Sequence, residues 1–286
     1  SMRLLNTSGV PCYQDPNRAS RALGGLHQYS QLRTRPDLTP QPIDDVNAKK
    51  AVTLLKGAWQ KEGAGFLDAH TASRIADAYG IPVPSSGLAR TVEEAIGIAD
   101  RIGYPVVMKL IAKDVVHKAD VGGIRLNLES DSAVRTAFHQ MMEDKVGAGS
   151  PNNKRVMIQK MTPQGQEIIL GSQRDPDFGP LLMAGMGGRY VEVFHDVAFR
   201  LAPLNKRDAI SMIEETIAGQ IMKGVRGAAS GDIPEVAEIL CRVGQLVSDF
   251  PCISELDINP VIVGEADRGA WAVDVRIAID REPDIE

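Results

Sequence analysis

The chain has 286 residues, of which 43% are apolar, and it carries a formal net charge of -5. This length allows one or two domains with a proper core, and the acidic balance, without a dense Lys/Arg stripe, argues against nucleic acid as the main partner. The three cysteines lie far apart without C-x-x-C spacing, so neither a disulfide framework nor a zinc site is indicated. Without a signal-peptide pattern or an apolar run of about 18 residues, we expect a cytoplasmic protein with no membrane partner.

Residues 1–36 are predicted to be the tail of a separate unit. Asp15 and Pro16 suit the N-cap and the first position of a helix. The apolar residues that follow recur at spacings of three and four, so they share a helix face that nothing in the same segment can bury. They are Ala19, Ala22, Leu23, Leu26, Tyr29 and Leu32. Residues 37–63 are expected to hold an extended, proline-rich linker and a helix.

The next segment carries clear start and stop signals for helices. Two helical patterns lie between residues 47 and 80, separated by a Gly-Ala-Gly sequence, and the second stops at Gly80. Thr91 and Glu94 match a capping box that begins a helix through about residue 102. A further helix is expected near residues 130–145.

The most informative stretch spans residues 106–128. An apolar β-type run delivers Lys109, a polar loop with His117 and Lys118 follows, and Gly122-Gly123 leads into a second, alternating run. We interpret this stretch as a β-hairpin with a basic, glycine-rich loop. Triphosphate binding needs such parts, because a cation reaches the phosphates and glycines let backbone N–H groups approach an anion. A solvated lysine and an ordinary turn would give the same pattern.

The second half of the chain mixes strands and helices. Strands are expected near residues 156–161, 167–172 and 181–184, then helices, and then three closing strands. The helices are expected near residues 206–216 and 233–250, and the closing strands near 253–256, 261–263 and 271–275. A glycine-rich GMGG sequence at residues 185–188 completes no G-x-G-x-x-G motif, so a Rossmann fold is rejected. Because βαβ units do not alternate regularly, the α+β class fits better than a doubly wound sheet.

Oxygen-bearing side chains gather near the C-terminus. Glu255, Asp257 and Asn259 share one strand face by the period of two, and Asp274 lies in a neighbouring run that could pair with theirs as a hairpin. Carboxylate and amide oxygens, completed by phosphate oxygens, are what Mg²⁺ prefers. The alternative is that these residues are solvated charges at strand ends. Glu167, taken alone, would also be an ordinary surface charge.

These motifs together resemble one known family, the NDP-forming acyl-CoA synthetases, which include relatives of the succinyl-CoA synthetase β subunit. The resemblance covers about residues 64–280 and concerns their ATP-grasp portion. It is carried by YGIPVP, VVMK, HKADVGG, RDPDFGP, GMGGRYVEVFHD, FRLAP, the Arg-Gly pair at Arg226, ELDINP and AVDVRI. Residues 2–36 resemble the end of the CoA-ligase region that precedes the ATP-grasp part in fused, single-chain versions.

The resemblance implies an α+β, ATP-grasp fold of two lobes with an N-terminal helical appendage. It implies an ATP-grasp domain over residues 64–286, with a smaller lobe at about 85–158. In that family, acyl-CoA and phosphate give an acyl phosphate, whose phosphoryl group passes through a histidine to a nucleoside diphosphate. The cofactors would be ATP/ADP and Mg²⁺. The CoA-binding and CoA-ligase domains would lie upstream in the same gene or on a partner subunit, in an oligomeric full enzyme.

The same resemblance assigns roles to individual residues. For the nucleotide, Lys109 with Gly122 and Gly123 would serve the phosphates, Gln159, Lys160 and Met161 the adenine, and Glu167 the ribose. For the metal, Asn259 and Asp274 would hold Mg²⁺, with Asp257 close by. For catalysis, His117, beside Lys118, matches a second histidine that can carry the phosphoryl group. A neutral imidazole is chemically suited to that role, although His117 could instead only bind phosphate or cap its loop.

Two other functions stay open at this stage. A generic ATP-grasp carboxylate–amine ligase would need its own acceptor pocket, and the HKADVGG loop argues against it. A regulatory nucleotide-binding module of an acetyltransferase fusion would keep the same fold. The presence of Lys109, Glu167, Asn259 and Asp274 favours a working site over such a regulatory module but does not exclude the module.

Overall fold

The computed structural model describes residues 2–34, 39–111, 123–143, 155–188, 196–224 and 229–283. The chain divides into two compact units, residues 1–39 and residues 40–286. The first unit holds α1 (Met2–Thr7), which the sequence analysis did not predict, and α2 (Pro16–Thr34). The predicted start of α2 is confirmed, because the Asp15 carboxylate accepts from the Asn17 N–H at 2.8 Å. Its apolar face is exposed, with Leu23 at 73% and Leu26 at 65%.

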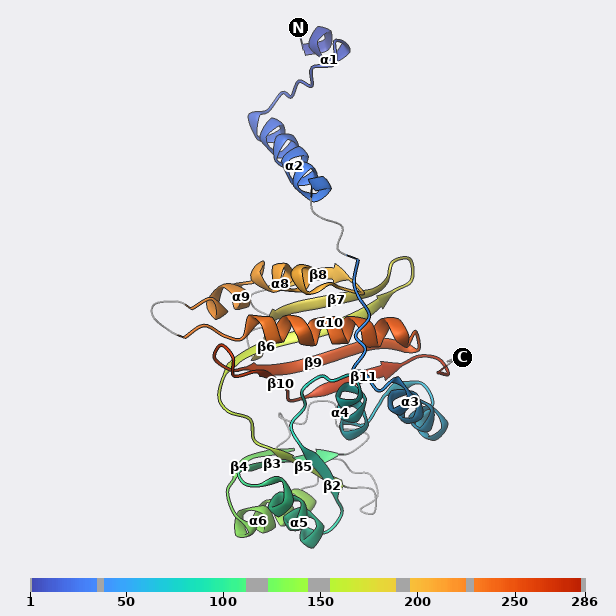
Figure 1. The fold of residues 1–286 in the computed structure, drawn as a ribbon, viewed down its shortest axis with the longest axis vertical. Coiled ribbons are helices and arrows are strands. Elements are labelled where there is room, and N and C mark those ends of the chain that lie inside the picture. Colours follow the sequence, from blue (N-terminus) through green and yellow to red (C-terminus); the bar gives the residue numbers. More distant parts are fainter. Residues whose placement is uncertain are drawn as a thin grey trace. The chain divides into compact units, whose positions relative to one another are not determined.

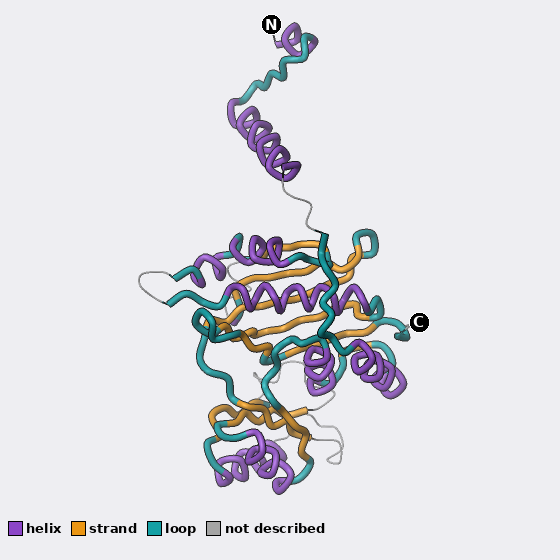
Figure 2. The backbone as a smooth tube through the Cα atoms, viewed as in Figure 1, coloured by secondary structure: helices purple, strands orange, loops and turns teal. Residues whose placement is uncertain are grey.

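The second unit contains two separate sheets, each antiparallel throughout (Figure 1, Figure 2). The larger sheet has the order β1-β11-β9-β6-β7-β8, with β10 paired to β9. Its strands are β1 (Gly65–Phe66), β6 (Gln166–Asp175), β7 (Gly179–Met186), β8 (Val197–Leu201), β9 (Ile253–Val263), β10 (Ala270–Ala272) and β11 (Val275–Ile279). Antiparallel pairing with helices segregated to one face is the α+β arrangement that the sequence predicted.

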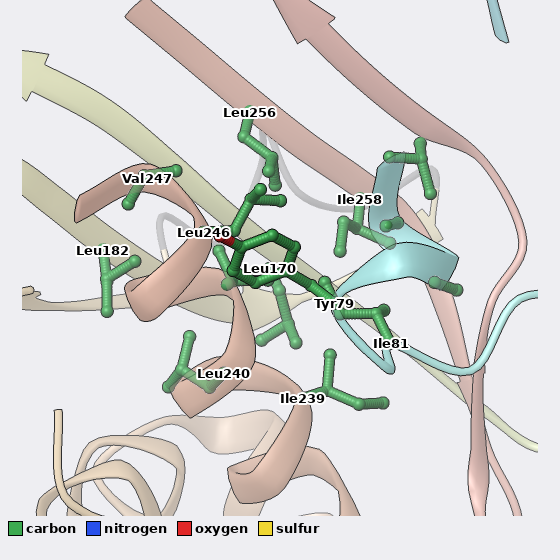
Figure 3. Close-up of a cluster of buried hydrophobic side chains, with 14 of the residues drawn as sticks. Tyr79, Ile81, Leu170, Leu182, Ile239, Leu240, Leu246, Val247, Leu256 and Ile258 are labelled. Atoms are coloured by element: carbon green, nitrogen blue, oxygen red, sulfur yellow. The ribbon is translucent and has the colours of Figure 1, made fainter. Parts of the chain in front are cut away.

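Three helices pack on one face of the larger sheet and form the main core with it. They are α8 (Lys206–Glu214), α9 (Ile217–Met222) and α10 (Ile233–Asp249). Figure 3 shows Leu170, Leu182 and Leu256 from the strands facing α10, and all three side chains are buried. Tyr79 is fully buried in this core, and its hydroxyl donates to the Asp249 carboxylate at 2.7 Å. Its only polar atom is therefore satisfied.

The smaller sheet has the order β2-β5-β3-β4 and its own core. Its elements are β2 (Ser86–Ala89), α5 (Val92–Ile102), β3 (Val106–Ile111), β4 (Ile124–Leu128), α6 (Asp131–Glu143) and β5 (Arg155–Lys160). The predicted hairpin is confirmed, because β3 pairs antiparallel with β4. The predicted capping box is also confirmed, with the Glu94 N–H donating to the Thr91 hydroxyl at 3.2 Å.

Two helices, α3 (Ala48–Glu62) and α4 (Ala69–Ala78), precede the smaller sheet in the chain. The extended segment before α3 is held against α10 by side chains. The Arg242 guanidinium donates to both carboxylate oxygens of Asp45 at 3.0 Å, and the Gln245 carboxamide bonds the N–H and the carbonyl of Ile43. Bidentate pairs of this kind fix geometry. The part of the predicted linker around Ile43 and Asp45 is therefore bound to the second unit.

Several strands and helices differ from the prediction, and β1, β2 and β8 were not predicted. β9 is continuous through Pro260, where two strands were expected, because the Pro260 carbonyl still accepts from the Val273 N–H at 3.1 Å. The last predicted strand is instead β10 and β11, separated by Val273 and Asp274. The helix predicted at 206–216 ends at Glu214, and Thr216 caps the separate helix α9. No helix in the described part of the chain is long and apolar enough to span a bilayer.

Candidate functional site

Lys109 lies inside β3 and is buried, with only 4% of its surface exposed. Its amine leaves the smaller sheet and donates to the Val273 carbonyl of the larger sheet's β10–β11 connection at 2.9 Å. A buried ammonium needs hydrogen-bond acceptors, since burial without them is costly. The structure therefore places the predicted phosphate-binding cation at the contact between the two lobes.

Gln159 approaches the same carbonyl from β5. Gln159 stands opposite Val107 in the β3–β5 ladder, so it shares a sheet face with Lys109, two residues further along β3. The side chain is 1% exposed, and its Nε2 lies 3.4 Å from the Val273 carbonyl oxygen. Its Oε1 has no hydrogen-bond partner among the residues that the structure describes. Two predicted nucleotide residues thus converge on one backbone group.

Two of the predicted metal ligands, Asp274 and Asn259, lie next to that backbone group. Asp274 follows Val273 directly, and the Asn259 N–H donates to the Asp274 carbonyl at 3.1 Å. Asp257 stands opposite Arg276 in the β9–β11 ladder, and the Asp274 carboxylate lies 3.9 Å from the Arg276 guanidinium. The predicted pairing of these two runs is confirmed, although Asp274 lies just before β11 rather than in it.

The charge around Asp257 is unusual for a surface strand. Burial raises the pKa of Asp257 to about 6; the Arg276 guanidinium opposes this rise, and the carboxylates of Asp274 and Glu255 add to it. Grouped carboxylates of this kind favour a cation, which would relieve their repulsion. Among the described residues, no three His, Cys, Asp or Glu side chains form a metal cluster. The carboxylate and amide oxygens of this region suit an ion such as Mg²⁺, which takes its other oxygen ligands from water and from a bound phosphate group.

Glu167 is exposed at the start of β6 and lies beside the GMGG glycines. A Cβ on Gly188, which has φ +79°, would come within 2.7 Å of the Glu167 Oε2. A Cβ on Gly187 would meet the Ile168 backbone at 2.7 Å, and the Gly187 N–H donates to the Glu167 carbonyl at 3.1 Å. These two glycines let the chain pack against Glu167, a role that the sequence analysis did not recognise.

Lys160 and Met161 are engaged elsewhere. The Lys160 amine donates to the carbonyls of Gly103 and Tyr104, at 3.0 and 2.9 Å, where α5 ends. The Met161 N–H donates to the Pro105 carbonyl at 3.1 Å. The Lys160 side chain therefore secures the smaller lobe, as cations near helix C-termini often do, and does not point to Val273.

The remaining predicted residues belong to the segment that connects β3 and β4 in the sequence. Gly123 is described, and its carbonyl accepts from the Leu110 N–H at 2.8 Å. His117, Lys118 and Gly122 lie outside the residues that the structure describes. The signal that sequence reasoning missed was the Val273 carbonyl, because backbone groups carry no residue-specific pattern.

Comparison with known proteins gives concordant matches. The family model described as "ATP-grasp domain" matches residues 58–279. The chain is 40% identical over 283 residues to the ADP-forming acetate–CoA ligase I of Archaeoglobus fulgidus, covering 99% of this chain and 41% of that protein. It is 42% identical to the β subunit of the ADP-forming acetate–CoA ligase I of Pyrococcus furiosus, covering 73% of this chain and 89% of that subunit.

A solved structure matches in three dimensions. It is the dinucleotide-forming acetyl-coenzyme A synthetase 1 of Ca. Korarchaeum cryptofilum, in complex with coenzyme A and Mg-AMPPCP, with a phosphohistidine segment pointing towards the nucleotide binding site. It has a TM-score of 0.71 and 38% identity, and the match covers 80% of this chain and 100% of that chain. The present chain spans about two-fifths of the length of the fused curated relatives, 41% and 39% of the first two.

Proposed function

Because the chain belongs to the ATP-grasp family and, within it, to the β portion of the ADP-forming acyl-CoA ligases, we propose that it is the nucleotide-binding half of an NDP-forming acyl-CoA synthetase. The expected ATP-grasp fold is confirmed by the match to the solved synthetase. The complete enzyme would convert acyl-CoA, ADP and phosphate reversibly into carboxylate, ATP and CoA. The observation that carries the proposal is the hydrogen bond from the Lys109 amine to the Val273 carbonyl, 2.9 Å long, which brings Lys109 next to Asp274.

In this proposal the smaller lobe holds the nucleotide phosphates. The Lys109 ammonium exchanges the Val273 carbonyl for a phosphate oxygen, a stronger, charge-assisted partner. Gly122 and Gly123 bring backbone N–H groups towards the same phosphates. Gln159 and the backbone of Lys160 and Met161 line the adenine site, and Glu167 accepts from the ribose hydroxyls.

The larger lobe would hold the metal that such a nucleotide carries. Asn259 and Asp274 supply an amide and a carboxylate oxygen, Asp257 lies on the same side, and phosphate oxygens fill further positions. When bound, Mg²⁺ neutralises charge on the phosphates as they react. The Asp257 carboxyl supports this role by its position, because it is partly buried, which raises its pKa, and the carboxylates of Asp274 and Glu255 add to that rise.

His117 would carry the phosphoryl group. Phosphate displaces CoA from the acyl-CoA, giving an acyl phosphate and CoA. The neutral imidazole of a histidine in the partner portion then attacks the phosphorus and the carboxylate leaves. The phosphoryl group passes from that histidine to His117 and then to ADP, which becomes ATP. Lys118, the next residue, would balance charge on the transferring group. These steps need acyl-binding and CoA-binding parts supplied by the partner portion.

The partner in this proposal is a CoA-binding and CoA-ligase portion. Relatives contain the β portion either fused or as a separate subunit, as in the ligases of Archaeoglobus fulgidus and Pyrococcus furiosus. The fused relative aligns over 99% of this chain and the separate subunit over 73%. This supports the view that residues 1–36 are the tail of a CoA-ligase region, residues 37–63 a linker and helix, and residues 64–286 the ATP-grasp domain.

Calorimetric titration of the chain with ADP tests the proposal. Binding is expected with Mg²⁺ and should weaken sharply when Mg²⁺ is chelated. Asp274→Asn should remove most of this metal dependence and leave the circular dichroism spectrum unchanged, because Asp274 is not a core residue. Binding of ADP that is indifferent to Mg²⁺, or no binding at all, would contradict the proposal. An unfolded Asp274→Asn protein would make Asp274 structural.

A further inference from the structure

The two faces of the larger sheet differ in what covers them. On one face, the side chains of Leu170, Leu182 and Leu256 are buried under α10 (Figure 3). Side chains alternate between faces along a strand, so the residues next to these point to the opposite face. That opposite face carries Asp257 and the candidate metal site.

One row of directly paired residues crosses this opposite face. It runs through β11, β9, β6, β7 and β8 as Arg276, Asp257, Gly171, Met183 and Phe199. Directly paired residues in antiparallel strands project on the same side. A Cβ on Gly171 would lie 3.4 Å from the Met183 methyl and 4.0 Å from the Asp257 Oδ1. The polar and apolar halves of the row therefore adjoin at Gly171.

The outer half of this face is apolar. Met183 and Phe199 are followed in the next row by Leu181 paired with Leu201, and Phe199 and Leu201 are each 48% exposed. We call these four residues the β7–β8 patch. The uncovered face of an antiparallel sheet is usually polar, as it is at Asp257. A contiguous exposed apolar patch beside a site marks a contact surface.

In the part of the chain that the structure describes, the smaller lobe's Lys109 and Gln159 contact the larger sheet away from the patch. Both side chains reach Val273, next to β11, whereas Phe199 and Leu201 lie on β8 at the far edge of the sheet order. The face between them leads from the nucleotide side to the patch. A phosphoryl donor can approach along this face, and its reaction must be shielded from water, which apolar contacts provide.

We propose that the β7–β8 patch docks the CoA-ligase portion of the same polypeptide, an inference that rests on the proposed function. The patch continues the row that contains Asp257, so its occupant is the portion that delivers the phosphoryl group. The same polypeptide is favoured over a separate subunit because the fused relative aligns over 99% of this chain, and the separate β subunit over 73%. Docking at the patch leaves the Lys109 side of this face open to the nucleotide.

The test uses the complete polypeptide and compares it with the 286-residue chain. Hydrogen exchange should show β7 and β8 more protected in the complete polypeptide. Phe199→Glu combined with Leu201→Glu should lower ATP formation from acetyl-CoA, ADP and phosphate by roughly tenfold or more. The Kd for Mg-ADP should change by less than about twofold, since neither residue lies in the proposed nucleotide site.

A control is Leu126→Glu, which places one such charge on an exposed leucine of β4 in the smaller sheet, 61% exposed. It should leave exchange at β7 and β8 unchanged. If the double glutamate variant fails to fold, the double alanine variant replaces it. Equal protection in both proteins, or normal ATP formation by a folded double variant, overturns the inference. Protected β7 and β8 in a protein that binds no nucleotide would instead sink the proposed function.

Discussion

The two sheets of the second unit contribute opposite charge to one site. The smaller sheet brings a buried ammonium, Lys109, from the middle of a strand, where neighbouring strands fix its position. The larger sheet brings the carboxylates of Asp257 and Asp274 from β9 and from the connection before β11. Lys109 is fixed in place by the strands that pair with β3. Asp274, in the connection between β10 and β11, can adjust its position to a metal. In the proposed nucleotide site, each sheet therefore supplies only part of what the nucleotide and its metal need.

Each sheet also has its own core. The larger sheet packs on α8, α9 and α10, and the smaller one on α5 and α6. Substitutions at the lobe contact should therefore change binding more than stability, while substitutions inside a lobe should do the reverse. The predictions below separate these two effects, beginning with the largest.

The largest effect is expected at His117, which follows β3 in the sequence. In the complete enzyme, His117→Ala should abolish phosphoryl transfer to ADP and leave the partner portion's histidine phosphorylated by acyl-CoA and phosphate. An acid-labile, base-stable phosphoryl adduct, measured with labelled phosphate, checks this. Normal ATP formation by the variant would return His117 to an ordinary loop residue.

Lys109→Ala should weaken Mg-ADP binding by roughly tenfold or more, because a charge-assisted hydrogen bond contributes about 1.5–3 kcal/mol. Lys160→Ala is the matched control on the same sheet. Its amine binds the Gly103 and Tyr104 carbonyls, so its loss should lower the free energy of unfolding by about 1–2 kcal/mol and leave affinity nearly unchanged. Calorimetry and urea unfolding measure the two effects. Equal losses of affinity in both variants would contradict the distinction.

Gly188→Ala should have the smallest effect on affinity, about three- to tenfold, because the new methyl group displaces the Glu167 carboxylate 2.7 Å away. Gly179→Ala separates this displacement from backbone strain. Gly179 also has a positive φ, +82°, but no atom lies within 4 Å of the added Cβ. Gly179→Ala therefore introduces the backbone strain without the displacement. Both variants should lose about 1 kcal/mol of stability, and only Gly188→Ala should lose affinity. An unaffected Gly188→Ala protein would remove Glu167 from the site.

Local chemistry explains which elements were predictable. The Thr91–Glu94 capping box and the stop at Gly80 depend on residues within one helical turn, so the sequence contains their full signal. The hairpin of β3 and β4 follows from alternation and glycines in the same way. The course of β9 through Pro260 was missed because the group that continues the pairing, Val273, belongs to another strand connection.

The site shows the same limit. Residue types pointed to Lys109, Asp257, Asn259 and Asp274, but not to the contact that joins the lobes. The Lys109 amine and the Val273 carbonyl are 164 residues apart in the chain, and no periodic pattern relates them. Lys160 shows the converse. The family resemblance assigned it to the adenine site, but its side chain binds backbone carbonyls at the end of α5.

The central claim is that Lys109 and Asp274 act on the same Mg-nucleotide from opposite lobes. A double-mutant cycle with Lys109→Met and Asp274→Asn, read as the Kd for Mg-ADP by calorimetry, tests it most directly. The account predicts that the two losses are not additive, with a coupling free energy of about 1 kcal/mol or more. Losses that add within about 0.3 kcal/mol would mean that the two residues act independently, and would contradict the shared site.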